Sequence, residues 1–399
     1  MKVLFCDPLN TQNSFYTYAK YLRQKGIDAA VVIGSGSVVP REHQPGWHDV
    51  GLVDPSWVIR QDLPYFLPYT NPREYWKRLR KLVATANKFD VIGCSGLAAT
   101  WMRWSRRPFV FFSYGSDLDQ LALQGWSGKS EQDADIKKKA VRWLIRKHLV
   151  GSLHKAKATV LAPYQIDTAK SIGLRNLVFL PHIIDLEVFK VLDNETRQSA
   201  KHDLHKELGC DLIFFHPSRQ AWTDRSQADC KGNDKVFRAF ARFREKNNHA
   251  RLVCVNKGWD LNMSKKLVKE LGITDSVTWL DPMNKTEMCS WYNAADVVLD
   301  QFVVGVLALV ALEPLACGTP SITYVAPTPE GMFYPKLPPV VNAHDEDEIY
   351  AGMCTLAGNP ALRDGLGEQG RQWVERYCSP ETAAEKFVAL FSSVSKGNK

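Results

Sequence analysis

The chain has 399 residues, of which 45% are hydrophobic and 24% charged, and its formal net charge is +8. This length supplies the cores of two α/β domains, and no run approaches the roughly eighteen consecutive apolar residues of a transmembrane helix. Nine cysteines without a C-x-x-C spacing argue against both a disulfide framework and a zinc site.

The positive charge is concentrated in the first half of the chain. Residues 1–190 hold 27 Lys and Arg against 16 Asp and Glu, whereas residues 191–399 hold 24 against 27. The excess in the first half suggests an anionic partner such as nucleic acid, a phospholipid surface or a phosphorylated acceptor. Ordinary solubilising charge is the simpler alternative.

The start of the chain has the pattern of a nucleotide-binding-like α/β domain. A strand over residues 2–7, a helix over 14–25 and a second strand over 27–33 form a βαβ unit. Ligands gather at the carboxyl ends of such strands, where the loop of this chain contains Asn13. An Asn at this position also caps a helix, and we favour capping over ligand contact for Asn13.

Two basic segments that also contain tryptophan follow. The first is a predicted helix over residues 71–88, and the second is a short helix over 98–107. Strands over residues 89–94 and 108–113 accompany them, and the second strand leads into the turn Tyr114–Asp117.

The helix predicted over residues 136–150 is amphipathic. Its apolar residues form one stripe, at positions 136, 140, 141, 144, 145 and 149, while Lys and Arg crowd the other faces. Such a pattern suits a helix on an anionic membrane, with Trp143 as an interfacial anchor. It also suits a helix whose stripe packs on the sheet, and on this pattern alone we favour the sheet.

A polar, charged stretch over residues 190–209 predicts the linker between two domains. It follows the last predicted strands of the first half, at residues 158–163 and 177–181. We therefore expect a first domain over residues 1–190 and a second over 191–380.

The second half alternates predicted strands with helices. The strands cover residues 211–219, 252–255, 277–280, 296–300 and 321–325. Strands and helices that alternate in this order favour a parallel, doubly wound sheet.

The stretch that organises this half runs from Val306 to Cys317. It is apolar on nearly every face, which predicts a helix buried among other elements, and Gly318–Pro320 ends it. Glu313 is its one charge, and a carboxylate on such a helix is costly unless something pairs with it. We therefore expect Glu313 to face a ligand in a cleft. A satisfied core carboxylate is the alternative.

The segment Glu313–Pro320, with its Cys-Gly-Thr-Pro ending, resembles the signature of retaining GT-B glycosyltransferases of family 4. The resemblance implies a GT-B architecture, in which two Rossmann-like domains with doubly wound parallel sheets face a central cleft. It also implies that Glu313 holds the ribose hydroxyls of a nucleotide-sugar. The family usually has another Glu eight residues earlier, where this chain has Gly305. A subgroup that carries Asp-Gln before such a Gly is similar to this chain at Asp300-Gln301.

The sugar of the donor is then expected near Gly305. Backbone amides or Gln301 are expected to contact the hexose there. The missing carboxylate leaves room for a bulky or anionic substituent on the sugar.

The resemblance also assigns the remaining donor contacts. Arg219 and Lys231 are implied to hold the diphosphate and to act in catalysis, which suits the planar fork of Arg and the compact charge of Lys. Arg225 is an alternative to Arg219, because the step to Lys231 is longer than the family usually shows. Leu309 and His182 are also expected at the donor, with His182 in place of an Asn of the family.

On the acceptor side, the resemblance points to the turn that follows a strand of the first domain. Gly115–Asp117 matches the Gly-Ser-Asp of the family, which implies a catalytic role for Asp117. Tyr114 stands where the family has a His. We expect Tyr114 and Asn13 to lie on the acceptor side.

As a whole, the resemblance implies an enzyme that moves a sugar from a nucleotide-diphosphate sugar to a hydroxyl of a saccharide or lipid-linked acceptor. Retention of configuration and a place in cell-envelope or polysaccharide biosynthesis are expected. No metal or other cofactor is expected, and a C-terminal helix over about residues 381–399 is expected to pack back on the first domain. A nucleotide-sugar epimerase and a non-catalytic nucleotide-binding protein on the same fold are the alternatives.

The expected location is the cytoplasm, because residues 1–7 lack the apolar region of a signal peptide. Residues 73–88 and 136–157 are basic, and we expect them to contact an anionic membrane at its cytoplasmic face. The chain carries no nucleic-acid recognition motif, so we expect no nucleic-acid partner.

Overall fold

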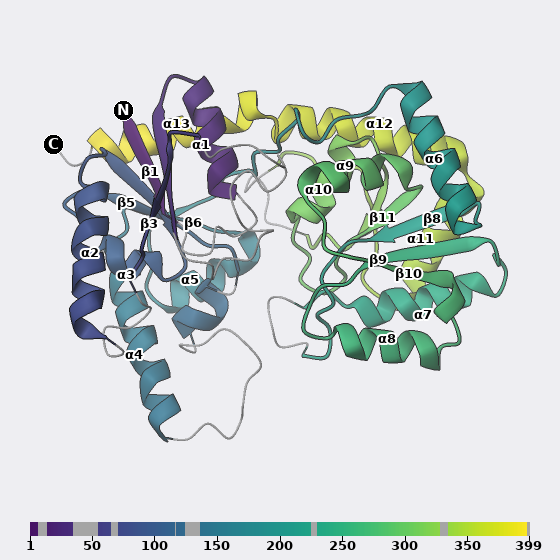
Figure 1. Cartoon of the computed structure of the whole chain (residues 1–399), viewed down its shortest axis with the longest axis horizontal. Helices are drawn as coiled ribbons and strands as arrows, with labels where there is room; N and C mark the ends of the chain where they lie inside the picture. The colour runs from purple at the N-terminus through teal and green to yellow at the C-terminus, as the bar shows by residue number, and fades with distance from the viewer. Residues whose placement is uncertain are drawn as a thin grey trace. The chain divides into compact units, whose positions relative to one another are not determined.

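The chain forms two compact α/β units in a computed structural model (Figure 1). The structure describes residues 1–6, 14–34, 55–64, 71–115, 117–123, 136–224, 230–327 and 334–396. One unit consists of Met1–Ile183 and Pro380–Lys399, and the other of Ile184–Ser379. Among the described residues, no helix is both long enough and apolar enough to span a membrane.

The first unit is built on a sheet of seven parallel strands in the order β3-β2-β1-β4-β5-β6-β7. The chain moves outward from β1 in one direction and then returns to continue on its other side, so the sheet is doubly wound. The strands are β1 (Lys2–Cys6), β2 (Asp28–Gly34), β3 (Val58–Gln61), β4 (Val91–Ser95), β5 (Phe109–Phe112), β6 (Ala158–Val160) and β7 (Leu177–Val178).

Helices cover both faces of this sheet, and each face has its own apolar core. One core includes residues of α2, α3 and α4, and the other includes residues of α1 and of the C-terminal helix α13. The helices are α1 (Ser14–Gln24), α2 (Pro72–Ala86), α3 (Ala98–Met102), α4 (Ile136–Leu153), α5 (Ile166–Ser171) and α13 (Pro380–Lys396), with a π-helical segment at Asp117–Ala122 and a 3-10 turn at Pro163–Gln165.

The C-terminal helix α13 packs on the sheet of the first unit through aromatic side chains. Phe391 meets Phe5 of β1 with ring centroids 5.6 Å apart, and Phe387 stacks on Phe112 of β5 at 6.0 Å. Rings that are buried together at these distances bind a helix to a sheet mainly through the apolar area they remove from water.

In the described part of the apolar stripe predicted for α4, the buried residues lie in the C-terminal half of the helix. Ile145 and Leu149 are buried, whereas Val141 is 41% exposed. Figure 1 shows the N-terminal half of α4 extending beyond the edge of the sheet. Neither interpretation of the stripe therefore holds for the whole helix.

The second unit contains a sheet of six parallel strands in the order β10-β9-β8-β11-β12-β13. The strands are β8 (Leu212–His216), β9 (Ala250–Val255), β10 (Val277–Leu280), β11 (Val297–Leu299), β12 (Ser321–Thr323) and β13 (Val341–Asn342). The helices are α6 (Asn194–Leu208), α7 (Asn233–Arg244), α8 (Leu261–Glu270), α9 (Lys285–Ala294), α10 (Leu309–Ala316), α11 (Glu346–Gly358) and α12 (Pro360–Tyr377), with a 3-10 turn at Thr274–Ser276. Two doubly wound parallel sheets confirm the predicted fold class.

The prediction of a linker over residues 190–209 is wrong, because most of this stretch is the helix α6. The Asp193 side chain caps its first turn by accepting from the N–H of Thr196 at 2.9 Å. Gly209 ends it in the left-handed conformation, at φ 60°. The helix has no buried residue, which is why its sequence has the polar composition of a linker.

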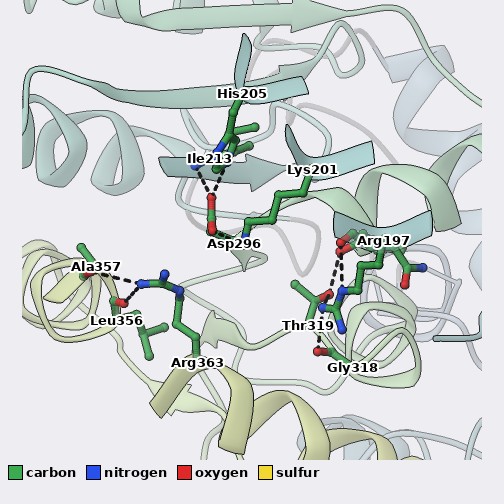
Figure 2. A network of polar contacts seen from close by, with 12 residues as sticks. Arg197, Lys201, His205, Ile213, Asp296, Gly318, Thr319, Leu356, Ala357 and Arg363 are labelled. Atoms are coloured by element: carbon green, nitrogen blue, oxygen red, sulfur yellow. Dashed lines mark hydrogen bonds and ion pairs between the residues drawn. The ribbon is translucent and has the colours of Figure 1, made fainter. Parts of the chain in front are cut away.

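Polar side chains of α6 attach it to the second unit (Figure 2), and its partly buried Leu204 and Leu208 pack against the core of that unit. Arg197 donates to the carbonyl of Gly318 at 3.0 Å and to the Thr319 hydroxyl at 3.2 Å. One turn further along, Lys201 and His205 reach the buried carboxylate of Asp296, which also accepts from the N–H of Ile213. The boundary between the two units lies before this helix, at Ile183–Ile184.

The carboxylate of Asp296 should therefore contribute to the stability of the second unit. Burial opposes its ionisation, but the contacts with His205 and Lys201 hold its pKa below the ordinary value. Such a group stabilises the fold above about pH 4 and loses its contribution as the pH falls further. Asp296→Asn should lower the free energy of unfolding by about 2 kcal/mol at pH 7, because a charged acceptor is lost.

Denaturant unfolding at pH 7 and at pH 3 measures this difference. The expected difference between the variant and the unsubstituted protein shrinks at pH 3. Asp203→Asn, at an exposed position of the same helix, is the control and should change nothing. An Asp296→Asn protein as stable as its parent at pH 7 would contradict the role of this carboxylate.

Candidate functional site

The candidate site of the second unit lies where the order of its strands reverses. β8 has β9 on one side and β11 on the other, and the chain runs outward to β10 before it returns to β11. Open α/β sheets bind ligands at the carboxyl ends of the strands at such a point. The residues that follow these two strands are therefore the first to consider as ligand contacts.

The ends of β8 and β11 are joined by a buried hydrogen bond between side chains. Ser218 Oγ donates to Asp300 Oδ1 at 2.6 Å, and both side chains are buried. Asp300 Oδ2 is buried and has no hydrogen-bond partner among the described residues. Burial raises the pKa of Asp300, while the charge of Lys231 opposes this. The edge of the sheet thus carries an acceptor oxygen within the electrostatic reach of a lysine.

Lys231 is fixed by its backbone between the two loops. Its N–H donates to the carbonyl of Ala221 at 2.6 Å, and its own carbonyl accepts from the N–H of Phe302 at 2.9 Å. Gly232 follows in the left-handed conformation at φ 71° and starts α7. These bonds place Lys231 at the start of a helix, where the dipole also favours an anion.

His216 connects β8, β11 and α7, a role that was not expected from the sequence. Its Nδ1 donates to the carbonyl of Leu299 at 2.9 Å, and its Nε2 accepts from Asn233 Nδ2 at 2.8 Å. Burial lowers the pKa of His216 to about 4, and the charge of Lys231 adds to this. The neutral ring therefore holds the start of α7 against the sheet. A His at the end of a buried strand is the only signal that the sequence gives.

Arg219 lies on the loop after β8, with its guanidinium over the ring of Trp259 at 5.0 Å. The N–H of the next residue, Gln220, donates to the carbonyl of Lys257 at 2.7 Å. The loop after β8 is thereby attached to the loop after β9, and Arg219 lies near the edge where ligands would bind. Arg225, the alternative to Arg219, lies outside the described residues.

Gln301 uses its whole side-chain amide to shape the turn between β11 and α10. Its Oε1 accepts from three successive N–H groups, those of Val303, Val304 and Gly305, at 2.9–3.2 Å. Its Nε2 donates to the carbonyls of Val306 and Tyr324, at 3.3 and 2.7 Å. The side chain is fully buried. Gln301 therefore acts on the site by holding this turn.

Gly305 cannot be replaced by a residue with a side chain without moving its neighbours. Its φ is 72°, which other L-residues rarely adopt. A Cβ at this position would lie 2.5 Å from Ala326 Cβ and 2.7 Å from Tyr324 Cε1. The backbone of Gly305 is also bonded on both sides, to Gln301 Oε1 and to the N–H of Ala326. A glutamate would therefore not fit in the turn that this chain forms at Gly305.

The helix α10 starts at Leu309, three residues later than the predicted start at Val306, because the turn held by Gln301 occupies the intervening residues. Its N-cap residue is Ala308, which offers no side-chain hydrogen bond to the first N–H groups. The N-terminus of a helix without a side-chain cap is suited to bind an anion.

Glu313 lies one turn along α10 and is 7% exposed. Its Oε2 accepts a hydrogen bond from the hydroxyl of Tyr292 at 3.2 Å. Burial raises the pKa of Glu313 to about 7, although the charge of Lys285 at the start of α9 opposes this. The carboxylate thus has one hydrogen-bond partner, Tyr292, and a nearby lysine, Lys285, neither of which was expected from the sequence.

The first unit brings together two of the predicted residues, Tyr114 and Asp117, after β5. Asp117 accepts hydrogen bonds from Ser113 Oγ, the N–H of Tyr114 and the N–H of Gly96, the last of which follows β4. Burial raises the pKa of Asp117 to about 6. The ring of Tyr114 packs on Phe15 of α1 at 5.7 Å. Asp117 thus joins the carboxyl ends of β4 and β5.

The structure gives less information on the two other predicted residues. Asn13 lies outside the described residues. His182 lies in the last residues of the first unit, and burial lowers its pKa to about 4. The described part of the chain contains no group of three His, Cys, Asp or Glu side chains that could hold a metal ion.

Part of the second unit matches a known family model. Residues 227–373 match the model described as Glycosyl transferases group 1. Lys231, Gly305 and Glu313 all lie within the matched residues.

Curated relatives carry names of glycosyltransferases. A D-inositol 3-phosphate glycosyltransferase of Pseudarthrobacter chlorophenolicus is 34% identical over 113 residues, which are 28% of this chain and 26% of the relative. An MMP alpha-(1->4)-mannosyltransferase of Mycolicibacterium hassiacum is 27% identical over 192 residues, 46% of each chain. The chain thus matches between about a quarter and a half of the length of these relatives.

Solved structures resemble the whole chain. A sucrose-phosphate synthase from Thermosynechococcus elongatus superposes with a TM-score of 0.70 at 16% identity, and the match covers 100% of both chains. HepE of Anabaena, in complex with UDP and glucose, gives a TM-score of 0.68 at 14% identity and covers 98% of this chain and 100% of HepE. These similarities establish the GT-B fold.

The packing around Gly305 predicts that a carboxylate cannot be restored at this position. Gly305→Ala should destabilise the second unit by about 2 kcal/mol, because a positive φ and a steric clash act together. Gly305→Glu should be at least as harmful. Denaturant unfolding measures both variants, and Gly358→Ala is the control, since a Cβ there meets nothing within 4 Å. If Gly305→Ala and Gly305→Glu were both as stable as Gly358→Ala, the tight packing described for this turn would be wrong.

The raised pKa of Glu313 predicts how the stability depends on pH. The folded protein keeps this proton up to about pH 7, whereas the unfolded chain releases it near pH 4.5. Stability should therefore fall as the pH rises from about 5 to 8, by up to about 3 kcal/mol. Glu313→Gln removes this dependence, whereas Glu270→Gln on the surface of α8 keeps it. Denaturant unfolding at about pH 5 and pH 8 measures this fall in stability. If the stability of Glu313→Gln and of its parent changed with pH in parallel, the prediction would be wrong.

Proposed function

We propose that the protein transfers a sugar from a nucleotide-diphosphate sugar to a hydroxyl group of a saccharide or lipid-linked acceptor. One observation carries the proposal. A lysine at the start of α7 and a buried carboxylate on α10 lie at the carboxyl edge of one parallel sheet, within residues that match the glycosyl transferases group 1 model. The names of the relatives support the same class of enzyme.

The diphosphate of the donor would bind at the positive groups of the second unit. Lys231 supplies a point charge at the start of α7, and Arg219 supplies a planar fork on the neighbouring loop. The uncapped N-terminus of α10 at Leu309 adds N–H groups and a favourable dipole. These groups would stabilise the charge that develops on the phosphate as the bond to the sugar breaks.

The ribose of the donor would bind at Glu313. Two hydroxyls can donate to one carboxylate, and among the described residues Tyr292 is the one hydrogen-bond partner of the Glu313 side chain, at 3.2 Å. Hydrogen bonds from the ribose favour the ionised form and would lower the raised pKa of Glu313. Donor binding should then be tighter above pH 7 than below it.

The sugar of the donor would lie by the turn around Gly305. Since the amide of Gln301 is bonded to the backbone of this turn, we propose that Gln301 positions the turn, and that the hexose contacts the turn itself. The absence of a side chain at Gly305 would leave space for a bulky or anionic substituent on the sugar.

The acceptor side belongs to the proposal as well. Asp117 and Tyr114 would act there with Asn13, and His182 would contact the donor. Retention of configuration, with the departing phosphate assisting the acceptor hydroxyl, needs no protein nucleophile and no metal. We place this activity in cell-envelope or polysaccharide biosynthesis, in the cytoplasm.

The test measures donor binding and turnover with the same set of variants. Thermal unfolding with a panel of nucleotide-diphosphate sugars should identify a donor that raises the midpoint. Lys231→Ala and Glu313→Gln should each weaken its binding about tenfold or more, the loss of one charge-assisted contact. Lys266→Ala, at an exposed position of α8, should bind like the parent.

The products then distinguish the possible activities. Transfer to an added saccharide or lipid-linked acceptor supports the proposal. Isomerisation or hydrolysis of the donor without an acceptor indicates an epimerase, and tight binding without any product indicates a binding protein. Equal binding by the parent, Lys231→Ala and Glu313→Gln would refute the site.

A further inference from the structure

Three tryptophans lie exposed on one helical layer of the first unit. Trp76 of α2 is 40% exposed, and Trp104, just after α3, and Trp143 of α4 are each 55% exposed. α2 packs against α3 and α3 against α4, and the three helices lie on the same side of the sheet (Figure 1). Isolated apolar residues are common at protein surfaces, but three tryptophans on one layer form a patch that indicates an interaction site.

Two of these tryptophans are in contact. The rings of Trp76 and Trp104 meet edge to face, with centroids 5.6 Å apart. Tyr75, next to Trp76, and Trp101, on the turn of chain before Trp104, are buried in the core. The exposed pair is therefore held in place by packed helices, and it presents indole rings to solvent at a defined position.

Cations surround the tryptophans. Arg73, Lys77 and Arg80 line a shallow depression of α2 together with Trp76, and all three are exposed. Arg103 lies 5.9 Å from the ring of Trp104, and Lys147 lies 4.8 Å from the ring of Trp143. We name these residues the basic-aromatic face: Arg73, Trp76, Lys77, Arg80, Arg103, Trp104, Trp143 and Lys147.

The charge of this layer has one sign. Residues 72–86, 103–107 and 136–153 contain 14 Lys and Arg and a single acidic residue, Glu74. The carboxylate of Glu74 is paired within α2, with Arg78 at 3.0 Å and Lys77 at 3.6 Å. The net charge of these three segments is therefore strongly positive, and it would attract an anionic partner.

We propose that the basic-aromatic face docks on the surface of an anionic lipid bilayer. Indole rings prefer the interface between headgroups and acyl chains, because an apolar ring there carries a polar N–H. Lys and Arg next to them gain from the negative surface potential. Neither tryptophans nor cations alone would select this surface, but the two together match it. The protein would bind reversibly, and no helix would cross the membrane.

The test is co-sedimentation of the full chain with vesicles, which does not depend on glycosyl transfer. The protein should bind vesicles of phosphatidylglycerol and phosphatidylcholine, release from them as salt increases, and not bind phosphatidylcholine alone. Charge reversal of Arg73, Lys77 and Arg80 to Glu should reduce partitioning by roughly a hundredfold or more. Replacement of Trp76 and Trp104 by Ala should reduce it by about tenfold.

Matched controls come from exposed residues of the second unit. Trp259→Ala removes another exposed tryptophan, and reversal of Lys265, Lys266 and Lys269 to Glu on α8 changes the net charge by the same amount as the α2 variant. Both controls should bind vesicles like the parent. Equal binding to the two vesicle types, loss in the controls as large as in the variants, or tighter binding to a duplex oligonucleotide than to the vesicles would overturn the proposal.

Discussion

The site of the second unit depends on the hydrogen bonds of a single buried amide, that of Gln301. The amide makes two bonds through its N–H₂ group and accepts three from successive N–H groups. Each bond contributes about 1 kcal/mol at most, but five on one side chain fix the path of the backbone. This path forces Gly305 into the left-handed conformation against Tyr324 and delays the start of α10 until Leu309. The position of Glu313 follows from where this helix begins.

Each buried carboxylate of the site lies near a lysine, whose charge offsets part of the cost of burial. Lys231 opposes the effect of burial on Asp300, and Lys285 does the same for Glu313. The two carboxylates also repel each other, since Asp300 contributes to the raised pKa of Glu313. A ligand with hydroxyl donors and phosphate groups would satisfy both signs of charge at once.

Much of the fold was predictable because apolar residues recur at different spacings along the strands and the helices of an α/β protein. The strands at residues 2–7, 277–280 and 321–325 were expected within two residues of their observed ends. The helix α6 was missed because Arg197, Lys201 and His205 attach much of it to the unit, and its two core contacts, Leu204 and Leu208, are too few to form a long apolar stripe. Hydrophobic periodicity in a sequence predicts helices that bury an apolar face, but it does not predict helices that are held mainly by polar side chains.

The site was predictable only where chemistry shows in the residue type. Glu313 stood out as a charge in an apolar run, and Lys231 was expected through the resemblance to the family. His216 and Tyr292 did not, because their roles depend on contacts with residues distant in the chain. The reason for a glycine at position 305 was also not predictable, because the sequence does not show which atoms a Cβ at this position would contact.

A crystal structure with a bound nucleoside diphosphate would test the central claim most directly. The account predicts density for the ribose against Glu313, and for the diphosphate between Lys231 and the N-terminus of α10. Density for the nucleotide at another place, or against the site with neither Glu313 nor Lys231 within hydrogen-bonding distance, would contradict it.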